Sequence, residues 1–279
     1  MDRFNKKKIG KKKKTFNGWK FRELKIQKNY KLNLDRESDF VILPEIFAHL
    51  AEDFLISSKI PYAIFVQNGY AIFSTNEYNK LSLAYRKAKF ILSSSKDIDE
   101  CISTVFPEFK NKILKVSLSV DSKKFNVNSK KSNLITYMPR KLFRHSELVV
   151  SFLQKLLPQT WSIKSIQNMP EKKVFEILSK SKIFLSFSEL EGLGLPPIEA
   201  ALAGNKVIGY TGEGGKEYWK KPIFTEIKNG DVKLFCKEVL KNLDNKRFVK
   251  KTIKQRKSLS LKYSTVNERK SIQNFLKNL

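Results

Sequence analysis

The fold is decided by residues 181–217, SKIFLSFSELEGLGLPPIEAALAGNKVIGYTGEGGKE. Ile183–Phe187 is a short apolar run whose length and β-rich composition predict a buried strand. A loop with glycines follows, and two prolines then lead into Ile198–Ala203, a run of good helix formers. Asn205–Tyr210 predicts a second buried strand after a glycine that ends the helix. The stretch is therefore a strand–loop–helix–strand unit, typical of a parallel α/β sheet.

The loop of this unit is suited to bind an anion. It lies after a strand and before a helix, where open α/β sheets bind their ligands. Glycines let a ligand approach the backbone, and free N–H groups with the helix dipole favour a phosphate.

Two glutamates flank the loop. Glu191 lies where the strand side of the unit ends, and Glu199 follows eight positions later. We expect Glu199 in the first helical turn. Carboxylates accept hydrogen bonds, so two of them beside an anion site suit a ligand with hydroxyl groups. A nucleotide-sugar has both phosphates and hydroxyls. Spacing alone leaves a structural role open, because the dipole also stabilises a glutamate in a first turn and glycine before a helix is common.

A longer pattern favours the functional interpretation. The run from Glu191 to Glu199, EGLGLPPIE, and the later GGKE at 214–217 closely resemble the donor-site segment of GT-B glycosyltransferases of the retaining, family-4-like kind. The resemblance implies that Glu199 holds the donor ribose and that Glu191 contacts the donor sugar. It also implies a set of donor-binding backbone positions: Gly192, Gly194, Leu195, Gly214 and Gly215. The glycine pair could instead form only a tight turn.

Two further segments contribute candidates. Tyr137–Lys141 ends a predicted strand that should reach the same sheet edge, where Arg140 and Lys141 offer positive charge to phosphate oxygens. The family that the chain resembles has an arginine and a lysine near this point, and the resemblance implies that Arg140 and Lys141 neutralise the donor diphosphate. Arg144 or His145 could replace Lys141, and an Arg-Lys pair also arises by chance in so basic a chain. Asn68 ends another strand and could contact the donor or the acceptor, or simply turn the chain.

The chain has 279 residues. Its pattern predicts two successive series of alternating strands and helices. We expect a basic tail at 1–20, a shortened N-terminal Rossmann-like domain at 21–128, a C-terminal Rossmann-like domain at 129–265 that binds the nucleotide-sugar, and a closing helix at 266–279 that returns to the first domain. Predicted strands before the central unit are 40–43, 62–67, 89–93, 113–118, 133–138 and 161–167. Predicted helices are 44–57, 77–88, 97–105, 146–157, 171–179 and 231–243, with a last strand at 222–227. We expect the N-terminal domain to be abbreviated relative to the family pattern, because residues 1–38 show no convincing counterpart of the family's first strand and glycine-rich loop.

The formal net charge of +28 is extreme. It predicts a polyanionic partner, either an anionic membrane surface or a nucleic acid, unless it is compositional bias that leaves a solvated surface. No stretch approaches the ~18 apolar residues of a membrane span, and no signal peptide is visible. Cys101 and Cys236 suggest neither a disulfide framework nor a zinc site, so we expect a cytoplasmic protein, at most peripheral to the membrane.

Together these features predict an α/β protein with two Rossmann-like, GT-B-like domains. It would transfer a sugar to a hydroxyl of a glycan, lipid-linked or other acceptor in surface polysaccharide or glycolipid synthesis. The resemblance implies retention of configuration and no required metal, and no cofactor besides the nucleotide-sugar is expected. Two alternatives stay open: a nucleotide-sugar-binding pseudo-enzyme, and a basic protein associated with nucleic acid, including a DNA-glucosylating one.

Overall fold

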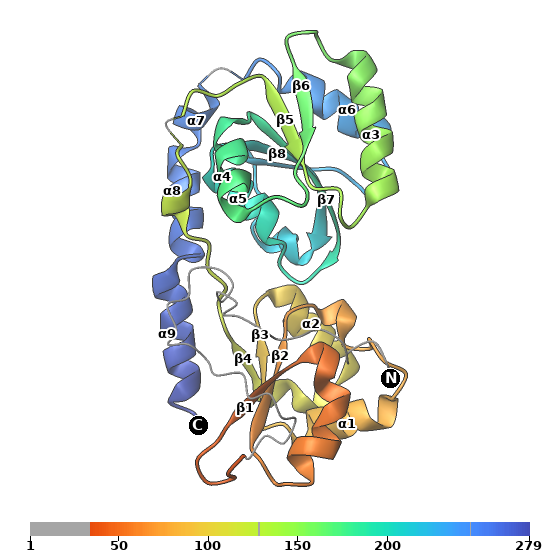
Figure 1. Ribbon diagram of the computed structural model, residues 1–279, viewed down its shortest axis with the longest axis vertical. Coiled ribbons are helices and arrows are strands. Elements are labelled where there is room, and N and C mark those ends of the chain that lie inside the picture. The colour runs from red at the N-terminus through yellow and green to blue at the C-terminus, as the bar shows by residue number, and fades with distance from the viewer. Residues whose placement is uncertain (1–33, 128, 246) are drawn as a thin grey trace. The chain divides into compact units, whose positions relative to one another are not determined.

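The structure is a computed structural model that describes residues 34–127, 129–245 and 247–279. Most of these residues belong to two parallel sheets with helices between successive strands (Figure 1). The first sheet has strand order β1-β2-β3-β4 and the second has order β6-β5-β7-β8-β9. The predicted basic tail lies outside the described residues. No helix in the described ranges is both long and apolar enough to cross a membrane.

The first sheet contains the shorter strands. They are β1 (Val41–Pro44), β2 (Tyr62–Val66), β3 (Phe90–Ser93) and β4 (Ile113–Lys115). Its helices are α1 (Tyr78–Lys87) and α2 (Lys96–Val105), with one-turn helices η3 (Gly69–Ala71), η4 (Pro107–Lys112) and η5 (Ser122–Lys124). Ser95 caps α2 by accepting a hydrogen bond from the N–H of Ile98.

The second sheet contains the central unit. Its strands are β5 (Leu134–Tyr137), β6 (Ser162–Ser165), β7 (Ile183–Glu191), β8 (Lys206–Glu213) and β9 (Phe224–Glu226). Its helices are α3 (Phe143–Leu156), α4 (Glu171–Lys180), α5 (Leu195–Leu202), α6 (Val232–Lys241), α7 (Phe248–Lys251) and α8 (Ile253–Lys262), with a short η6 at Gly214–Glu217. The apolar run of β7 is buried, as a strand between two neighbours and two helical layers requires.

Side chains of β7 alternate between two cores. Ile183, Leu185 and Phe187 pack with α3 and α6, whereas Phe184 packs with α4 and α5 on the other face. Figure 1 shows these helix pairs covering opposite faces of the second sheet. The edge strand β6 carries exposed polar residues instead, consistent with its position.

The last helix, α9 (Thr265–Leu276), contacts the first sheet rather than the second. Phe275 meets the rings of Phe40 and Phe90 edge-on, with centroids 5.9 and 6.0 Å away. Ser119 donates a hydrogen bond to the carboxylate of Glu268 at 2.8 Å. Side-chain packing therefore holds α9 on the strands that begin the described chain.

Three predicted elements differ from the structure. Residues 44–57 form a 3₁₀ helix η1 (Glu45–Leu50) and a π-helical turn η2 (Glu52–Ile56), not one α-helix. The strand predicted at 113–118 ends at Lys115, where pairing with β3 stops. Helix α5 begins at Leu195, and the two prolines occupy its first turn, where their missing N–H groups cost no hydrogen bond. Glu199 is therefore the fifth helical residue and lies beyond the first turn.

Candidate functional site

The order of the second sheet places a switch point between β5 and β7. Chain connections leave these neighbouring strands toward opposite faces, which opens the sheet edge where their carboxyl ends meet. Lys141 follows β5 and Glu191 ends β7. The ammonium of Lys141 lies 2.9 Å from Glu191 Oε1, and both side chains remain partly exposed. Two predicted site residues are thus brought together across the switch point.

The loop after β7 is held between two backbone segments. A Cβ on Gly192 would lie 2.1 Å from the carbonyl oxygen of Gln67, at the end of β2. A Cβ on Gly214, in the turn after β8, would lie 2.0 Å from the carbonyl oxygen of Gly192. Only glycine permits such approaches. Both predicted glycines therefore set the position of the loop itself, whatever the loop binds.

A residue that the sequence did not indicate closes the same loop. The buried hydroxyl of Tyr218 lies 3.1 Å from the carbonyl oxygen of Leu193 and 2.7 Å from that of Gly194, and it donates to them. Burial raises the pKa of Tyr218, with smaller contributions from Glu191 and Glu217. The sequence gives only a weak indication of this role. A tyrosine directly follows GGKE, and the hydroxyl of a buried tyrosine needs a hydrogen-bond partner.

The tip of α5 offers fewer donors than an ordinary helix start. Gly194 is its N-cap, in the left-handed region with φ of 75°. Pro196 and Pro197 occupy the first turn and have no N–H. Anion binding at this tip therefore depends on the N–H groups of Gly194 and Leu195.

Glu199 is the least compensated acid of the region. Burial, with a smaller contribution from the charge of Glu171, raises its pKa to about 7, and Lys124 opposes the shift. Lys124 is itself paired with Glu171 at 3.0 Å. Within the described ranges, no group hydrogen-bonds to or forms an ion pair with the Glu199 carboxylate. An acceptor that is largely buried and unpaired is suited to receive hydrogen bonds from a ligand.

The remaining predicted residues lie differently. Arg140 is exposed and has no partner among the described residues. Asn68 is engaged by the protein: its amide donates to the carbonyl oxygen of Leu190 at 2.9 Å, and its Oδ1 accepts from the N–H of Tyr70 at 3.1 Å. Asn68 therefore fixes the end of β7 from the side of the first sheet.

Glu217 is a second acid that sequence reasoning placed only within a motif. Its carboxylate accepts from the N–H of Lys96 at 3.0 Å, from Lys262 at 2.9 Å and from the hydroxyl of Tyr263 at 2.8 Å. Burial alone would raise its pKa, but these hydrogen bonds outweigh burial and lower the pKa. Glu217 thus connects the start of α2 with the end of α8, and its acceptors are already used.

The described part of the chain contains no cluster of metal-ligating side chains. No group of three or more histidine, cysteine, aspartate or glutamate side chains is placed to hold an ion there.

The protein has the GT-B fold, which confirms the predicted fold class. No family model matches the sequence. HepE from Anabaena, solved in complex with UDP, superposes with a TM-score of 0.70 over 88% of this chain and 80% of HepE, at 11% identity. The pneumococcal O-GlcNAc transferase GtfA, solved with UDP and GlcNAc, gives 0.61 over 88% of this chain and 58% of GtfA, at 15% identity. TarM gives 0.59 over 86% of this chain and 54% of TarM, at 13% identity.

One curated protein is similar in sequence over a shorter stretch. It is an alpha-1,6-glucosyltransferase of Actinobacillus pleuropneumoniae serotype 7 (strain AP76), 35% identical over 68 residues. The match covers 24% of this chain and 17% of that protein. The chain thus spans a small part of this relative and little more than half of TarM and GtfA.

Proposed function

We propose that the protein transfers a sugar from a nucleotide-sugar to an acceptor hydroxyl, with retention of configuration and without a required metal. The observation that carries the proposal is the pair of acids at the switch point. Glu191 is partly exposed beside a lysine, and Glu199 is half-buried with no hydrogen-bonding partner in the described ranges. The names of the structural neighbours, two of them solved with UDP, support a nucleotide-sugar as the donor.

Each residue has a distinct role in this proposal. The Glu199 carboxylate accepts hydrogen bonds from the ribose hydroxyls, which replace the water lost on burial. Glu191 contacts the sugar. Arg140 and Lys141, with the N–H groups at the tip of α5, face the diphosphate, where negative charge grows as the donor departs.

The reaction breaks the bond between the sugar's anomeric carbon and the diphosphate oxygen, which keeps the electron pair. A new bond forms between that carbon and the acceptor oxygen, and the acceptor's proton passes to the departing diphosphate oxygen. The transition state resembles an oxocarbenium ion, as in other glycosyl chemistry. The ammonium of Lys141, which is paired with Glu191, is then shared between Glu191 and the leaving group.

The acceptor belongs to the proposal as well. A glycan or lipid-linked hydroxyl in polysaccharide or glycolipid synthesis suits the sugar transferases that the chain resembles. A cytoplasmic protein with a strongly basic surface could meet such an acceptor at an anionic membrane. Nucleic acid is the less favoured partner, because the acids at the switch point have no use in binding it.

A donor panel tests the function. The full chain is incubated with UDP-glucose, UDP-GlcNAc and other nucleotide-sugars, thermal stabilisation is recorded, and products are read by mass spectrometry. We expect one donor to stabilise the protein and to be hydrolysed or transferred. Glu199→Gln should lose the stabilisation, whereas Glu189→Gln, an exposed neighbour on β7, should keep it.

Two outcomes would favour the alternatives. Stabilisation that depends on Glu199 without any hydrolysis or transfer indicates a pseudo-enzyme. No response to any donor, together with salt-sensitive binding to DNA in both variants, contradicts the proposal and indicates a nucleic-acid partner.

A further inference from the structure

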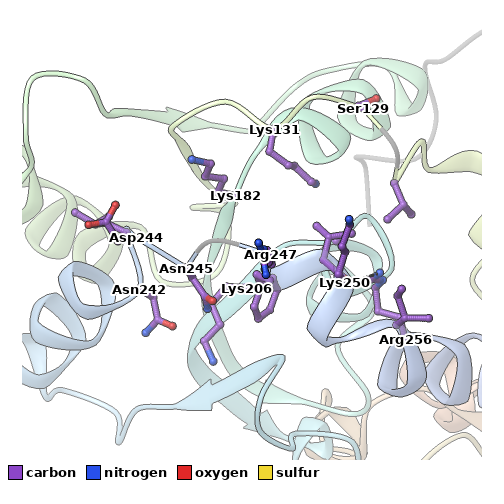
Figure 2. A pocket seen from close by; sticks show the side chains of 16 residues that line it. Ser129, Lys131, Lys182, Lys206, Asn242, Asp244, Asn245, Arg247, Lys250 and Arg256 are labelled. Atoms are coloured by element: carbon purple, nitrogen blue, oxygen red, sulfur yellow. Dashed lines mark hydrogen bonds between the residues drawn. The ribbon is translucent and has the colours of Figure 1, made fainter.

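A cavity of about 630 Å³ lies at the other edge of the second sheet (Figure 2). Lys131 precedes β5, Lys182 immediately precedes β7, and Lys206 is the first residue of β8. All three therefore lie at the amino ends of strands, whereas Lys141 and Glu191 lie at the carboxyl ends. The cavity is separate from the proposed donor site, and its volume is in the range of small-molecule pockets.

The lining of the cavity has an unbalanced charge. Six cationic side chains line it: Lys131, Lys182, Lys206, Arg247, Lys250 and Arg256. Asp244 is the one carboxylate among the lining residues. None of the six forms an ion pair with a carboxylate in the described ranges. Cations that outnumber the carboxylates of the lining repel one another, and a bound anion would relieve this repulsion.

Two of these cations are held in a low-dielectric environment. Burial, together with the smaller effect of the nearby charge of Arg256, lowers the pKa of Lys131 to about 7. Burial also lowers the pKa of Lys206 to about 8. The charges of Lys131 and Arg256 are close enough to repel each other. An anion bound between the two side chains would stabilise both charges.

Helix ends explain part of this arrangement. The Lys131 ammonium donates to the carbonyl oxygens of Ala203, at 2.6 Å, and Leu178, at 3.3 Å, near the ends of α5 and α4. Cations are favourable there because of the helix dipoles. These contacts use two of its three donors, so one N–H remains for a ligand. The dipoles do not account for Arg247 and Lys250, which are exposed and have no partner in the described chain.

The walls between the cations are apolar. Val127, Leu243, Phe248, Val249 and Ile253 line the same cavity. Figure 2 shows labelled cations at the cavity from the segments before β5 and β7, from the start of β8, and from α7 and α8 with the residue before α7. A ligand that matches this surface has a multiply charged anionic group and a compact apolar part.

We propose that this cavity binds a phosphate-bearing anion and constitutes a second ligand site of the protein. The phosphate lies among Lys131, Arg247 and Arg256, and the organic part contacts the apolar wall. A free nucleotide and the headgroup of an anionic lipid share this chemistry. The proposal does not depend on the proposed transfer reaction.

Isothermal titration of the full chain tests the site. The probes are inorganic tripolyphosphate, ADP, and vesicles of phosphatidylglycerol with phosphatidylcholine vesicles as their blank. The test variant is Arg247→Ala/Lys250→Ala, which changes only exposed side chains and should fold. The matched control is Lys233→Ala/Lys237→Ala on α6, which removes the same charge from exposed positions outside the cavity lining.

We expect saturable binding of one probe, weakened about tenfold in Arg247→Ala/Lys250→Ala and less than about twofold in the control, since each lost charged hydrogen bond weakens binding by roughly that order. Preference for tripolyphosphate or ADP identifies a soluble ligand, and preference for phosphatidylglycerol identifies a lipid. Equal weakening in both variants would show only the general attraction of a basic surface and would overturn the proposal. Absence of saturable binding to every probe would overturn it as well.

Discussion

The two edges of the second sheet use the same physical effect on opposite charges. At the carboxyl edge, burial raises the pKa of Glu199 to about 7. At the amino edge, burial lowers the pKa of Lys131 to about 7. Removal from water disfavours the charged form in both cases, so each group stays close to losing its charge at neutral pH. Each is therefore sensitive to a ligand that restores the interactions of the charged form.

Their surroundings differ in what the protein supplies. Lys131 has carbonyl acceptors at two helix ends, so its position has a structural reason even without a ligand. Glu199 has no hydrogen-bond donor within the described ranges, and its nearest acid, Glu171, works against ionisation. Glu199 therefore depends more strongly on a ligand than Lys131 does. A ligand at the carboxyl edge should accordingly have the larger effect.

The largest effect is expected from the loop that frames the carboxyl edge. Gly192→Ala would place a Cβ 2.1 Å from the carbonyl oxygen of Gln67, so the loop or the end of β2 must shift. We expect donor turnover to fall by about a hundredfold or more, because small displacements of positioning groups have effects of that order. Unfolding free energy should fall by about 1–3 kcal/mol. Turnover and chemical denaturation of the purified variant measure the two quantities.

Gly215→Ala is the matched control for this substitution. The nearest atom to its new Cβ would be the Tyr218 hydroxyl oxygen at 3.4 Å, an ordinary contact. We expect an unfolding free energy close to wild type; turnover is compared only for Gly192→Ala, because Gly215 is itself a predicted donor-binding position. An equal loss of unfolding free energy in both variants would show that the loop tolerates no added carbon anywhere, and the specific role of the Gly192 contact would be wrong.

The second effect concerns the stability cost of the unpaired acid. Glu199 has an ordinary pKa of 4.5 when unfolded and about 7 when folded. Below 4.5 it is protonated in both states and has no effect. As the pH rises toward 7 it ionises more readily in the unfolded chain, which destabilises the fold, and above 7 the penalty is constant at about 2–3 kcal/mol.

Glu199→Gln removes this penalty while it weakens donor binding. We therefore expect the variant to exceed wild type in unfolding free energy by about 2–3 kcal/mol at pH 8 and by almost nothing at pH 4. Urea denaturation at both values measures the difference. Exposed Glu189→Gln should show no such dependence. A variant less stable than wild type at pH 8 would indicate that the carboxylate already has a partner and would remove the basis of its proposed role.

The sequence predicted the parts of the site that depend on local pattern. The apolar run of β7 and the acids at its loop follow from composition and spacing over a few residues. The place of Glu199 in α5 differs from the prediction, because the helix begins at Leu195 and Glu199 lies just beyond its first turn. The reason why Gly192 must be glycine could not be predicted, since Gln67 lies far away in the chain and its contact depends on how the two sheets meet.

The amino edge shows the opposite case. Its cations are dispersed between Lys131 and Arg256 and follow no motif. A chain with 55 lysines and arginines offers many such residues, so only the fold reveals which of them share a cavity. The roles of Tyr218 and Asn68 in fixing the loop were likewise invisible, because both act through backbone carbonyl oxygens rather than through a sequence pattern.

The smallest effect is the most direct test of the contrast between the edges. Hydroxyl donors favour the ionised form of Glu199, so donor-site affinity should rise from pH 6 to pH 8, by up to about tenfold. Uridine is the probe, because it presents a ribose without a titrating phosphate. An anion favours the charged form of Lys131, so affinity at the amino edge should instead fall by about two- to threefold, since Lys131 is one of several cations there. Trimetaphosphate, whose charge is constant over this range, is the second probe.

Titrations of both probes at pH 6, 7 and 8 should give slopes of opposite sign. Glu199→Gln should flatten only the uridine slope and Lys131→Met only the trimetaphosphate slope. Slopes of the same sign for both probes would mean that a global property of the basic chain, rather than the two buried groups, governs binding.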